Sequence, residues 1–350
     1  MSGGCHHNVK KRSKFQKIGG LATAIFVITA IAALFRGMNV PDQNLLPQIA
    51  INFTAIVFEA MPFMLIGSVF GGLIEVYVPR EWLASFLARG QKRVVFAAAA
   101  MGFLFPVCEC AVVPVVRRLV KKGVPAPAAI AYLLAAPIVN PIVIASTFVA
   151  YNRDWRMPAL RLVLGYVVAV ITGLIIGRFT KEKDILLDSI RPQADACSLA
   201  DRNASVFQKI TGVFQHACDD FFEVGRYLII GAFIAALLRT VVSMETFHSI
   251  ASQPWLAILV MMVMAVALNL CSEADAFIAA CFRNVLPGTS QLAFLVLGPM
   301  LDIKLILMYT TLFKRRAIIL LPILLFVLVF ASIFGVHLLI GGRFYAVVQP

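Results

Sequence analysis

The sequence predicts an all-α polytopic membrane protein made of two related halves, the second inverted relative to the first. Three observations lead to this fold class: an apolar composition, a series of long apolar runs, and an internal repeat of acids, prolines and glycines. Hydrophobic residues make up 61% of the 350 residues, charged residues make up 14%, and the mean hydropathy is +0.89. A soluble chain of this length needs a larger polar surface, whereas a bilayer solvates apolar side chains.

Apolar runs divide the chain into regions. A crossing helix needs about 20 apolar residues, and runs lie at 18–35, 49–78, 94–107, 125–150, 158–177, 219–241, 255–270, 289–309 and 317–341. The first run follows a basic segment and ends without a clear small-residue cleavage site, so we expect residues 1–46 to hold a cytoplasmic tail and an uncleaved first transmembrane helix. The polar stretch 181–208 is expected to be a cytoplasmic linker between two membrane repeats, 47–180 and 209–350.

Two of these runs are too short to cross a bilayer alone. The runs at 94–107 and 255–270 are each followed by an amphipathic piece, 108–122 and 272–286, that is also too short or too polar to span. We therefore expect each pair to form a re-entrant helical hairpin that enters the membrane and returns to its own side.

The distribution of basic residues predicts the topology. The net charge is +13, but the basic residues cluster in short connectors beside apolar runs. With the N-terminus inside, most of the 31 Lys and Arg residues fall on the inside; those on the outside are Arg36, Arg153, Arg156, Arg161, Arg239, Arg283 and Arg343. This bias follows the positive-inside rule. The expected partner is therefore the lipid bilayer and not a nucleic acid, and the N-terminus is expected in the cytoplasm.

An internal repeat relates the two halves. Phe58-Glu59 aligns with Phe222-Glu223, Gly67 with Gly231, and Glu109 with Glu273. After a loss of two residues in the second half the match resumes, and the aligned pairs are Pro125 with Pro287, Pro137 with Pro299, and Asn140 with Asp302. An odd number of crossings separates the first helix of one repeat from that of the other, so the second repeat is inverted. Inverted repeats with discontinuous helices are typical of secondary transporters, whose substrate site lies at the repeat interface.

The acids at the hairpin tips are the first candidates for a solute or ion site. Glu109 and Glu273, with Asp275 two residues further on, fall where the backbone leaves helical geometry within the membrane. Carboxylates at that depth are costly and are retained for function, here the binding of a cation or the exchange of a proton. The structural alternative is that these acids stabilise the N-termini of the short helices that follow.

Two further acids lie inside long apolar runs. Glu59 falls about ten residues into its run and precedes Pro62, which allows the helix to kink past the acid. Its repeat partner Glu223 has Arg226 three residues later, so an intrahelical ion pair is the structural alternative to a functional role.

Two proline motifs predict breaks in the middle of spans. Pro137 precedes Asn140, and Pro299 precedes Asp302, with Lys304 close enough to neutralise the acid. Backbone carbonyls freed at such a break, together with the amide or carboxylate, can hold a solute or an ion. A proline kink with a packed polar side chain is the alternative.

Cys108 and Cys110 flank Glu109, and thiolates are soft ligands for metals and metalloids. The second repeat keeps the acid but carries Ser272 and Ala274 beside it, and two cysteines are fewer than an ordinary metal site uses. Small packing residues are therefore the alternative, and we expect Cys218, Cys271 and Cys281 to pack also. No further cofactor is indicated.

At these residues the chain resembles the YraQ-like predicted permeases, which are relatives of the permeases that export trivalent organoarsenicals. The resemblance covers about residues 45–316 and rests on the Cys-Glu-Cys motif around Glu109, the stretch from Ala135 to Pro141, the stretch from Cys271 to Phe277, and the Gly-Pro-x-x-Asp-x-Lys motif ending at Lys304. It implies a permease of the bacterial inner membrane, with Cys108 and Cys110 as the positions that arsenical export would need.

The function expected is therefore gradient-coupled movement of a small solute or ion, and the chain is not expected to be an enzyme. No Gly-x4-Gly-Lys-Ser/Thr motif occurs, so ATP is not expected to be hydrolysed by this chain. Two alternatives from other classes stay open: a membrane thiol oxidoreductase working through Cys108 and Cys110, and a non-transporting subunit of a membrane assembly. Association into a homo-oligomer is also open.

Overall fold

The structure is a computed structural model that describes residues 45–77, 91–105, 107–180, 182–190, 206–241, 253–283 and 285–340. The expected first transmembrane helix, within residues 1–46, and most of the linker at 181–208 lie outside the described residues. The described chain consists of helices joined by turns and short connecting segments, with one isolated antiparallel bridge between Leu186 and Phe313. The all-α class expected from the apolar composition is confirmed.

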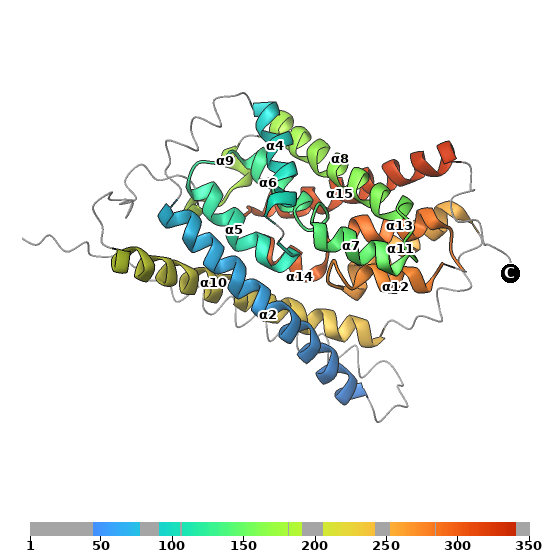
Figure 1. Ribbon diagram of the computed structural model, residues 1–350, viewed down its shortest axis with the longest axis horizontal. Helices are drawn as coiled ribbons and strands as arrows, with labels where there is room; N and C mark the ends of the chain where they lie inside the picture. The colour runs from blue at the N-terminus through green and yellow to red at the C-terminus, as the bar shows by residue number, and fades with distance from the viewer. Residues whose placement is uncertain are drawn as a thin grey trace, which may run out of the picture. The chain divides into compact units, whose positions relative to one another are not determined.

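The helices of each half follow one another in the same order (Figure 1). The first half contains α2 (Leu45–Tyr77), α4 (Gln91–Leu104), α5 (Glu109–Lys121), α6 (Ala126–Ala135), α7 (Pro141–Ala150) and α8 (Arg156–Phe179). After α9 (Glu182–Ile185) and the 3-10 turn η1 (Asp188–Ile190), the second half contains α10 (Val206–Val241), α11 (Pro254–Leu268), α12 (Asp275–Cys281), α13 (Gly288–Leu297), α14 (Ile303–Tyr309) and α15 (Arg315–Ile340).

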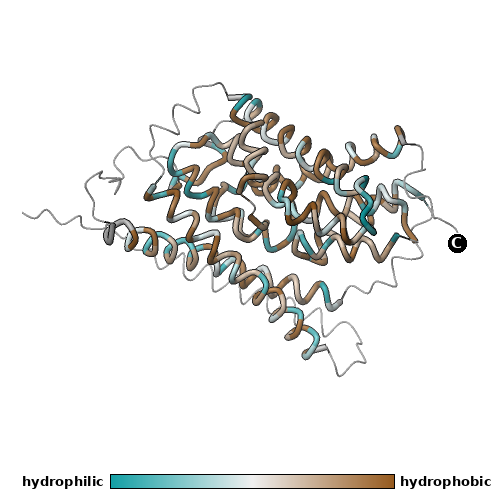
Figure 2. The backbone as a smooth tube through the Cα atoms, viewed as in Figure 1, coloured by the Kyte–Doolittle hydropathy of each residue, from teal (hydrophilic) through white to brown (hydrophobic). Residues whose placement is uncertain are grey.

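Four of the described helices are long and apolar enough to cross a bilayer. They are Leu46–Tyr77 in α2, Arg156–Phe179 in α8, Ile210–Thr240 in α10 and Arg315–Leu339 in α15. Most of the tube in Figure 2 is hydrophobic along these helices, and its hydrophilic stretches are short. Large apolar side chains remain exposed on them, for example Phe58 in α2 and Ile319 in α15. Such exposure is stable against lipid and costly against water, so the chain is a multi-pass membrane protein.

The expected breaks within two apolar runs are present. The run at 125–150 divides into α6 and α7, and the run at 289–309 divides into α13 and α14. Pro137 and Pro299 lie in the turns that separate these pairs. Each second helix begins with a side-chain cap, because the Asn140 side chain accepts from the amide of Ile142 at 2.9 Å and the Asp302 carboxylate accepts from the amide of Leu305 at 2.5 Å.

The two short helices α6 and α13 are enclosed by other helices. Every residue of both helices is buried. In the first half α6 packs on α4 and α8, and in the second half α13 packs on α11 and α15. Helices that are apolar on all sides can be enclosed in this way by other helices.

The helix bounds of the two halves correspond as the repeat predicts: α2 matches α10, α4 matches α11, α5 matches α12, α6 matches α13, α7 matches α14 and α8 matches α15. The inverted orientation of the halves and the re-entrant path of the hairpins relative to a bilayer stay predictions. So do the domain boundaries at 47–180 and 209–350.

Glycines allow the long helices to approach the site closely. A Cβ at Gly67 in α2 would lie 2.5 Å from the carbonyl oxygen of Ala111 in α5. Its repeat partner Gly231 in α10 meets the backbone of α14, where a Cβ would lie 2.8 Å from the Cα of Lys304. Only glycine permits these approaches. Gly67 therefore allows α2 to pack against α5, which carries Glu109, and Gly231 allows α10 to pack against α14, which carries Lys304.

Candidate functional site

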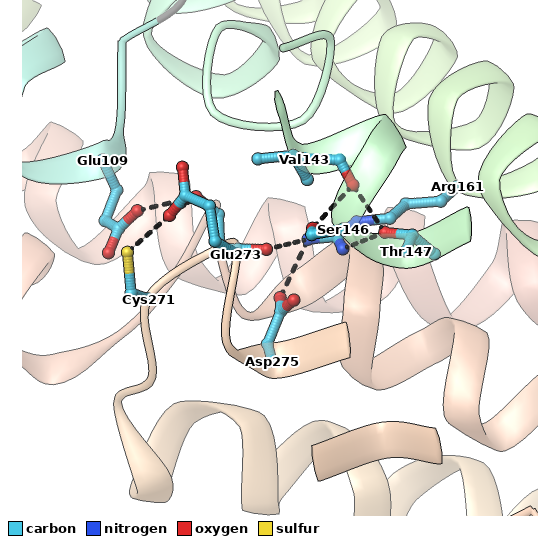
Figure 3. A network of polar contacts seen from close by, with 9 residues as sticks. Glu109, Val143, Ser146, Thr147, Arg161, Cys271, Glu273 and Asp275 are labelled. Atoms are coloured by element: carbon cyan, nitrogen blue, oxygen red, sulfur yellow. Dashed lines mark hydrogen bonds and ion pairs between the residues drawn. The ribbon is translucent and has the colours of Figure 1, made fainter. Parts of the chain in front are cut away.

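The turn between α4 and α5 meets the turn between α11 and α12; we call these two turns the hairpin tips, after the hairpins predicted there. Glu109 is the first residue of α5, and Ser272 and Glu273 lie in the turn between α11 and α12. The Ser272 hydroxyl lies 3.1 Å from Oε2 of Glu109 and 3.3 Å from Oε2 of Glu273. A hydroxyl has one proton to donate, so the two carboxylates compete for it. Figure 3 shows Glu109 and Glu273 converging from their separate elements.

Lys304 is the cation of this cluster. Its Nζ lies 3.3 Å from Oε1 of Glu109 and 3.5 Å from Oδ2 of Asp302. Glu109 and Asp302 are each 1% exposed and Lys304 is 3% exposed. Charges this deeply buried have lost their hydration, and only mutual pairing offsets the loss. The contact between Lys304 and Asp302 was expected, because the two residues are close in sequence. The contact between Lys304 and Glu109 joins the two halves of the chain.

The other contacts of Asp302 are with backbone and amide groups. Besides capping α14, its carboxylate faces the side-chain amide of Asn269, whose φ of 51° lies in the left-handed region. Asparagine adopts that region more readily than most residues, so α11 can end at this point and direct the amide at the acid. Asn140, the repeat partner of Asp302, caps α7 and is not among the residues that line the site cavity.

A small cavity lies beside this cluster. Its volume is about 10 Å³, close to the space that one water molecule needs. The wall combines acids, cysteines and the lysine, and its lining residues include Glu59, Glu109, Cys108, Cys110, Cys271 and Lys304. Glu59, which α2 contributes, is exposed. It therefore lies where the cavity meets the surface of the described chain, while Glu109 and Lys304 are buried.

Glu273 differs from Glu109 in its partners. Its Oε2 is contacted by the Cys271 thiol at 2.7 Å and by the Ser272 hydroxyl, which are both neutral groups. Glu273 is partly exposed, whereas Glu109 is buried against the Lys304 ammonium. The two acids that the repeat relates therefore occupy different electrostatic environments.

A second buried ion pair holds the other hairpin. Arg161 in α8 is 1% exposed and its guanidinium lies 2.9 Å from Oδ2 of Asp275. The same group donates to the Ser272 carbonyl at 3.0 Å and to the Thr147 hydroxyl at 2.8 Å (Figure 3). Each hairpin tip is thus bound by a cation from the opposite half, since Lys304 binds the first and Arg161 the second.

An ion pair with Arg226, the structural alternative considered for Glu223, is not the pair found among the described residues. Glu223 instead lies 2.5 Å from Arg117 of α5, and Arg226 lies over the ring of Tyr227. Arg117 is buried near the end of a short helix and pairs with an acid of the other half, whereas an ion pair three residues apart on one helix contributes little. Glu223 of α10 therefore contacts the end of α5 that is remote from Glu109, and a role for it in transport stays a prediction.

The cluster around Arg117 ties the end of α5 to α10 and α2. Arg118 pairs with Asp220, and Arg117 approaches the same acid at 3.6 Å. Lys122 donates to the backbone carbonyl of Glu75 at 2.5 Å. We call Arg117, Arg118, Lys122, Glu75, Asp220 and Glu223 the α5 clamp.

Three cysteines lie at the cavity. Cys108 and Cys110 are buried and free, and Cys271, which we expected only to pack, lines the same cavity. Within the described residues, no group of three or more His, Cys, Asp or Glu side chains is arranged to hold a metal ion.

Sequence reasoning missed the residues that connect the halves. Arg161 lies within the apolar run at 158–177 and could have been selected by the criterion applied to Glu59, namely an ionisable residue in a span. We expected it instead at the end of its helix on the outer side of the membrane. Ser272 and Asp220 carry no local signal, because a serine in a turn and an acid in a helix are common on protein surfaces.

The site carries an excess of negative charge. Glu59, Glu109, Glu273 and Asp302 lie in or beside the cavity, and Lys304 is the cation that contacts this group in the described structure. Such a cluster attracts a cation or a proton.

Comparisons with known proteins find a family of predicted permeases and several of its members. The ArsP_1 model, described as "Predicted permease", matches residues 45–337. The chain is 41% identical to the UPF0718 protein YcgR of Bacillus subtilis over 280 residues, which cover 80% of this chain and 94% of the relative. It is 39% identical to a Streptococcus mutans protein named "Putative two-component membrane permease complex subunit" over 268 residues, which cover 76% of this chain and 87% of the relative.

A third relative, the UPF0718 protein YraQ of Escherichia coli, is 29% identical over 140 residues, which cover 39% of each chain. No solved structure matches the chain. The family match covers both hairpins, both broken helices and most of the described residues. The chain belongs to this family of predicted permeases.

Proposed function

We propose that this membrane transporter is a secondary permease of the bacterial inner membrane, with its N-terminus in the cytoplasm, that moves a small solute or ion by gradient coupling. The observation that carries the proposal is the meeting of Glu109 and Glu273 at one hydroxyl, with Lys304 on one acid and neutral groups on the other. The family favours a transporter over an enzyme.

The geometry suggests how binding and movement are coupled. In the described structure Lys304 neutralises Glu109 and holds the first hairpin tip against α14. A cation or proton that binds at Glu273 and Glu59 adds positive charge near Glu109. This charge replaces part of the attraction between Glu109 and the Lys304 ammonium. Because Lys304 also contacts Asp302, its ammonium can shift toward that acid. The hairpin tips are then free to separate.

Neutral variants of the two tip acids test the mechanism. Glu109→Gln or Glu273→Gln should abolish gradient-coupled flux in liposomes while the purified protein stays monodisperse, because glutamine keeps the shape and removes the exchangeable charge. Asp219→Asn, which alters an exposed acid on α10, is the matched control and should transport normally. Unchanged flux in both glutamine variants would contradict an acid-centred mechanism.

The three cysteines of the cavity favour a thiophilic solute. Cys108, Cys110 and Cys271 line the same space, one thiol more than sequence reasoning placed there. Trivalent arsenicals are a fitting class because arsenic(III) binds thiols, and export of such a compound is the substrate we propose. A growth screen of a deletion strain against metals, metalloids and organic toxicants should show sensitivity to arsenicals.

Flux measurements on serine variants then separate the alternatives. The Cys108→Ser/Cys110→Ser/Cys271→Ser variant should lose arsenical flux in liposomes. Intact flux would show that the thiols are not part of the transport site, and it would exclude the thiol oxidoreductase alternative. Flux by the pure chain would also exclude a non-transporting subunit; flux that appears only with a second component would assign the chain to a two-component complex, as its Streptococcus mutans relative is named.

A further inference from the structure

A large cavity lies away from the acid cluster, where α8 ends and α15 begins. It has a volume of about 530 Å³ and is predominantly apolar. Its wall reaches from Phe179 and Ile323, which are 80% and 58% exposed, inward to Ile130 of the buried helix α6. A cavity of this size is within the range of about 300–1,000 Å³ that small-molecule sites occupy.

The cavity has a basic mouth. Arg316 lines it, Arg315 precedes Arg316 in the first turn of α15, and Arg178 lies in the last turn of α8. Arg316 and Asp184 are the charged residues of the lining, and Arg315 and Arg178 each directly precede a lining residue, Arg316 and Phe179. The first turn of α15 contains no acid. Cations are unfavourable at the positive end of a helix dipole, so an anion bound here would offset both the arginines and the dipole.

The floor of the cavity is held in place by backbone hydrogen bonds. The amide of Lys314 donates to the carbonyl of Ile185 at 2.7 Å, and the amide of Leu187 donates to the carbonyl of Leu312 at 3.1 Å. Lys314 also pairs with Asp188 at 3.3 Å. The segment 182–190 is therefore fixed beneath the start of α15, and the space beside it is a preformed groove.

We propose that this groove binds an anionic phospholipid, with an acyl chain along its apolar wall and the phosphate at Arg316. Both bordering helices are membrane-length, and the basic residues place this end of them at the side predicted to be cytoplasmic. Apolar space of this size excludes water in favour of hydrocarbon, and basic pockets between transmembrane helices are suited to lipid headgroups. The groove is separate from the acid cluster, so the proposal does not depend on the transport mechanism.

Lipid binding to the full-length purified protein tests the proposal. Thermal unfolding and native mass spectrometry in detergent are recorded with phosphatidylglycerol, with phosphatidylcholine of the same chains, and with glycerol phosphate. Phosphatidylglycerol should raise Tm and be retained in the mass spectrum, phosphatidylcholine should do so less, and glycerol phosphate should have no effect. An equal rise with glycerol phosphate would assign the site to a free anion and overturn the proposal.

Two variants locate the site. Arg316→Gln should weaken retention of phosphatidylglycerol about tenfold, equivalent to about 1.4 kcal/mol, because one charged partner of the phosphate is lost. Arg156→Gln removes an exposed arginine at the opposite end of α8 and should leave retention unchanged. Equal retention by the Arg316→Gln variant and the wild type, or equal retention of the two lipids by the wild type, would overturn the proposal. Since Arg316 is exposed, its loss is not expected to impair folding.

Discussion

At the scale of single residues, the site depends on compensation between buried charges. Lys304 contacts Glu109 and Asp302, and each of the three is almost fully buried. Arg161 and Asp275 form a second pair of the same kind on the other hairpin. A buried charge that loses its partner keeps its desolvation cost without the attraction that offset it. Replacing one member of either ion pair should therefore destabilise the protein more than replacing both members together.

We expect Lys304→Met to destabilise the protein by about 3–5 kcal/mol, the range for breaking a buried ion pair. Adding Glu109→Gln should recover part of this loss, because the uncompensated charge is then removed. The measurement is thermal or denaturant unfolding of the two single variants and the double variant in detergent. Strict additivity of the two effects would show that Lys304 and Glu109 do not interact.

Arg161→Lys should impair stability although it preserves the charge. The guanidinium joins Thr147, the Ser272 carbonyl and Asp275 from one planar group, and an ammonium cannot reproduce this geometry. We expect a loss of about 1–3 kcal/mol, the cost of leaving a buried polar group without a partner. Arg156→Lys, at the exposed start of the same helix, is the control and should change Tm little. A wild-type Tm for Arg161→Lys would argue against this role.

At the scale of elements, the long helices are positioned by close backbone approaches. Gly67 brings α2 against α5, and Gly231 brings α10 against α14. The α5 clamp fixes the other end of α5 through Arg117, Arg118 and their acids on α10. The first hairpin is therefore held at both ends, at its tip by Lys304 and at its far end by the clamp.

Substitution of Gly67 should separate α2 from the first hairpin. In Gly67→Val the new side chain would collide with the backbone of Ala111, and overpacking of this kind costs about 1–3 kcal/mol. We expect a lower Tm and reduced flux. Gly335→Val provides the control, since a Cβ at Gly335 in α15 meets nothing within 4 Å. Equal effects of the two substitutions would show that the approach of α2 is not tightly constrained.

At the scale of the whole molecule, the inverted repeat predicts that corresponding residues of the two halves lie on opposite sides of the membrane. Lys121 ends α5, and Val285 follows α12 in the corresponding region of the second half. In a chain whose seven cysteines are replaced by serine, a cysteine at 121 should react with membrane-impermeant reagents from the inside and one at 285 from the outside. A permeant reagent should label both. Labelling of both positions from one face by the impermeant reagent would contradict the inversion.

The same scale shows which parts of the fold were accessible from the sequence. The breaks after α6 and α13 were predictable, because Pro137 and Pro299 disrupt helices locally. The long spans were predictable from apolar length alone. The partner of Glu223 was not, since a helical acid has candidate cations both on its own helix and across the structure, and only packing brought Arg117 to it.

The sequence by itself determined that the chain is a helical membrane protein and which acids, prolines and glycines recur in its halves, since both follow from local composition and spacing. Tertiary structure decided which charges neutralise which. Glu109 and Glu273 are repeat partners, yet one meets Lys304 and the other meets a thiol and a hydroxyl. Pairing depends on distances of a few ångströms between elements far apart in the chain, and Coulomb energy in a weakly polar interior varies steeply over such distances.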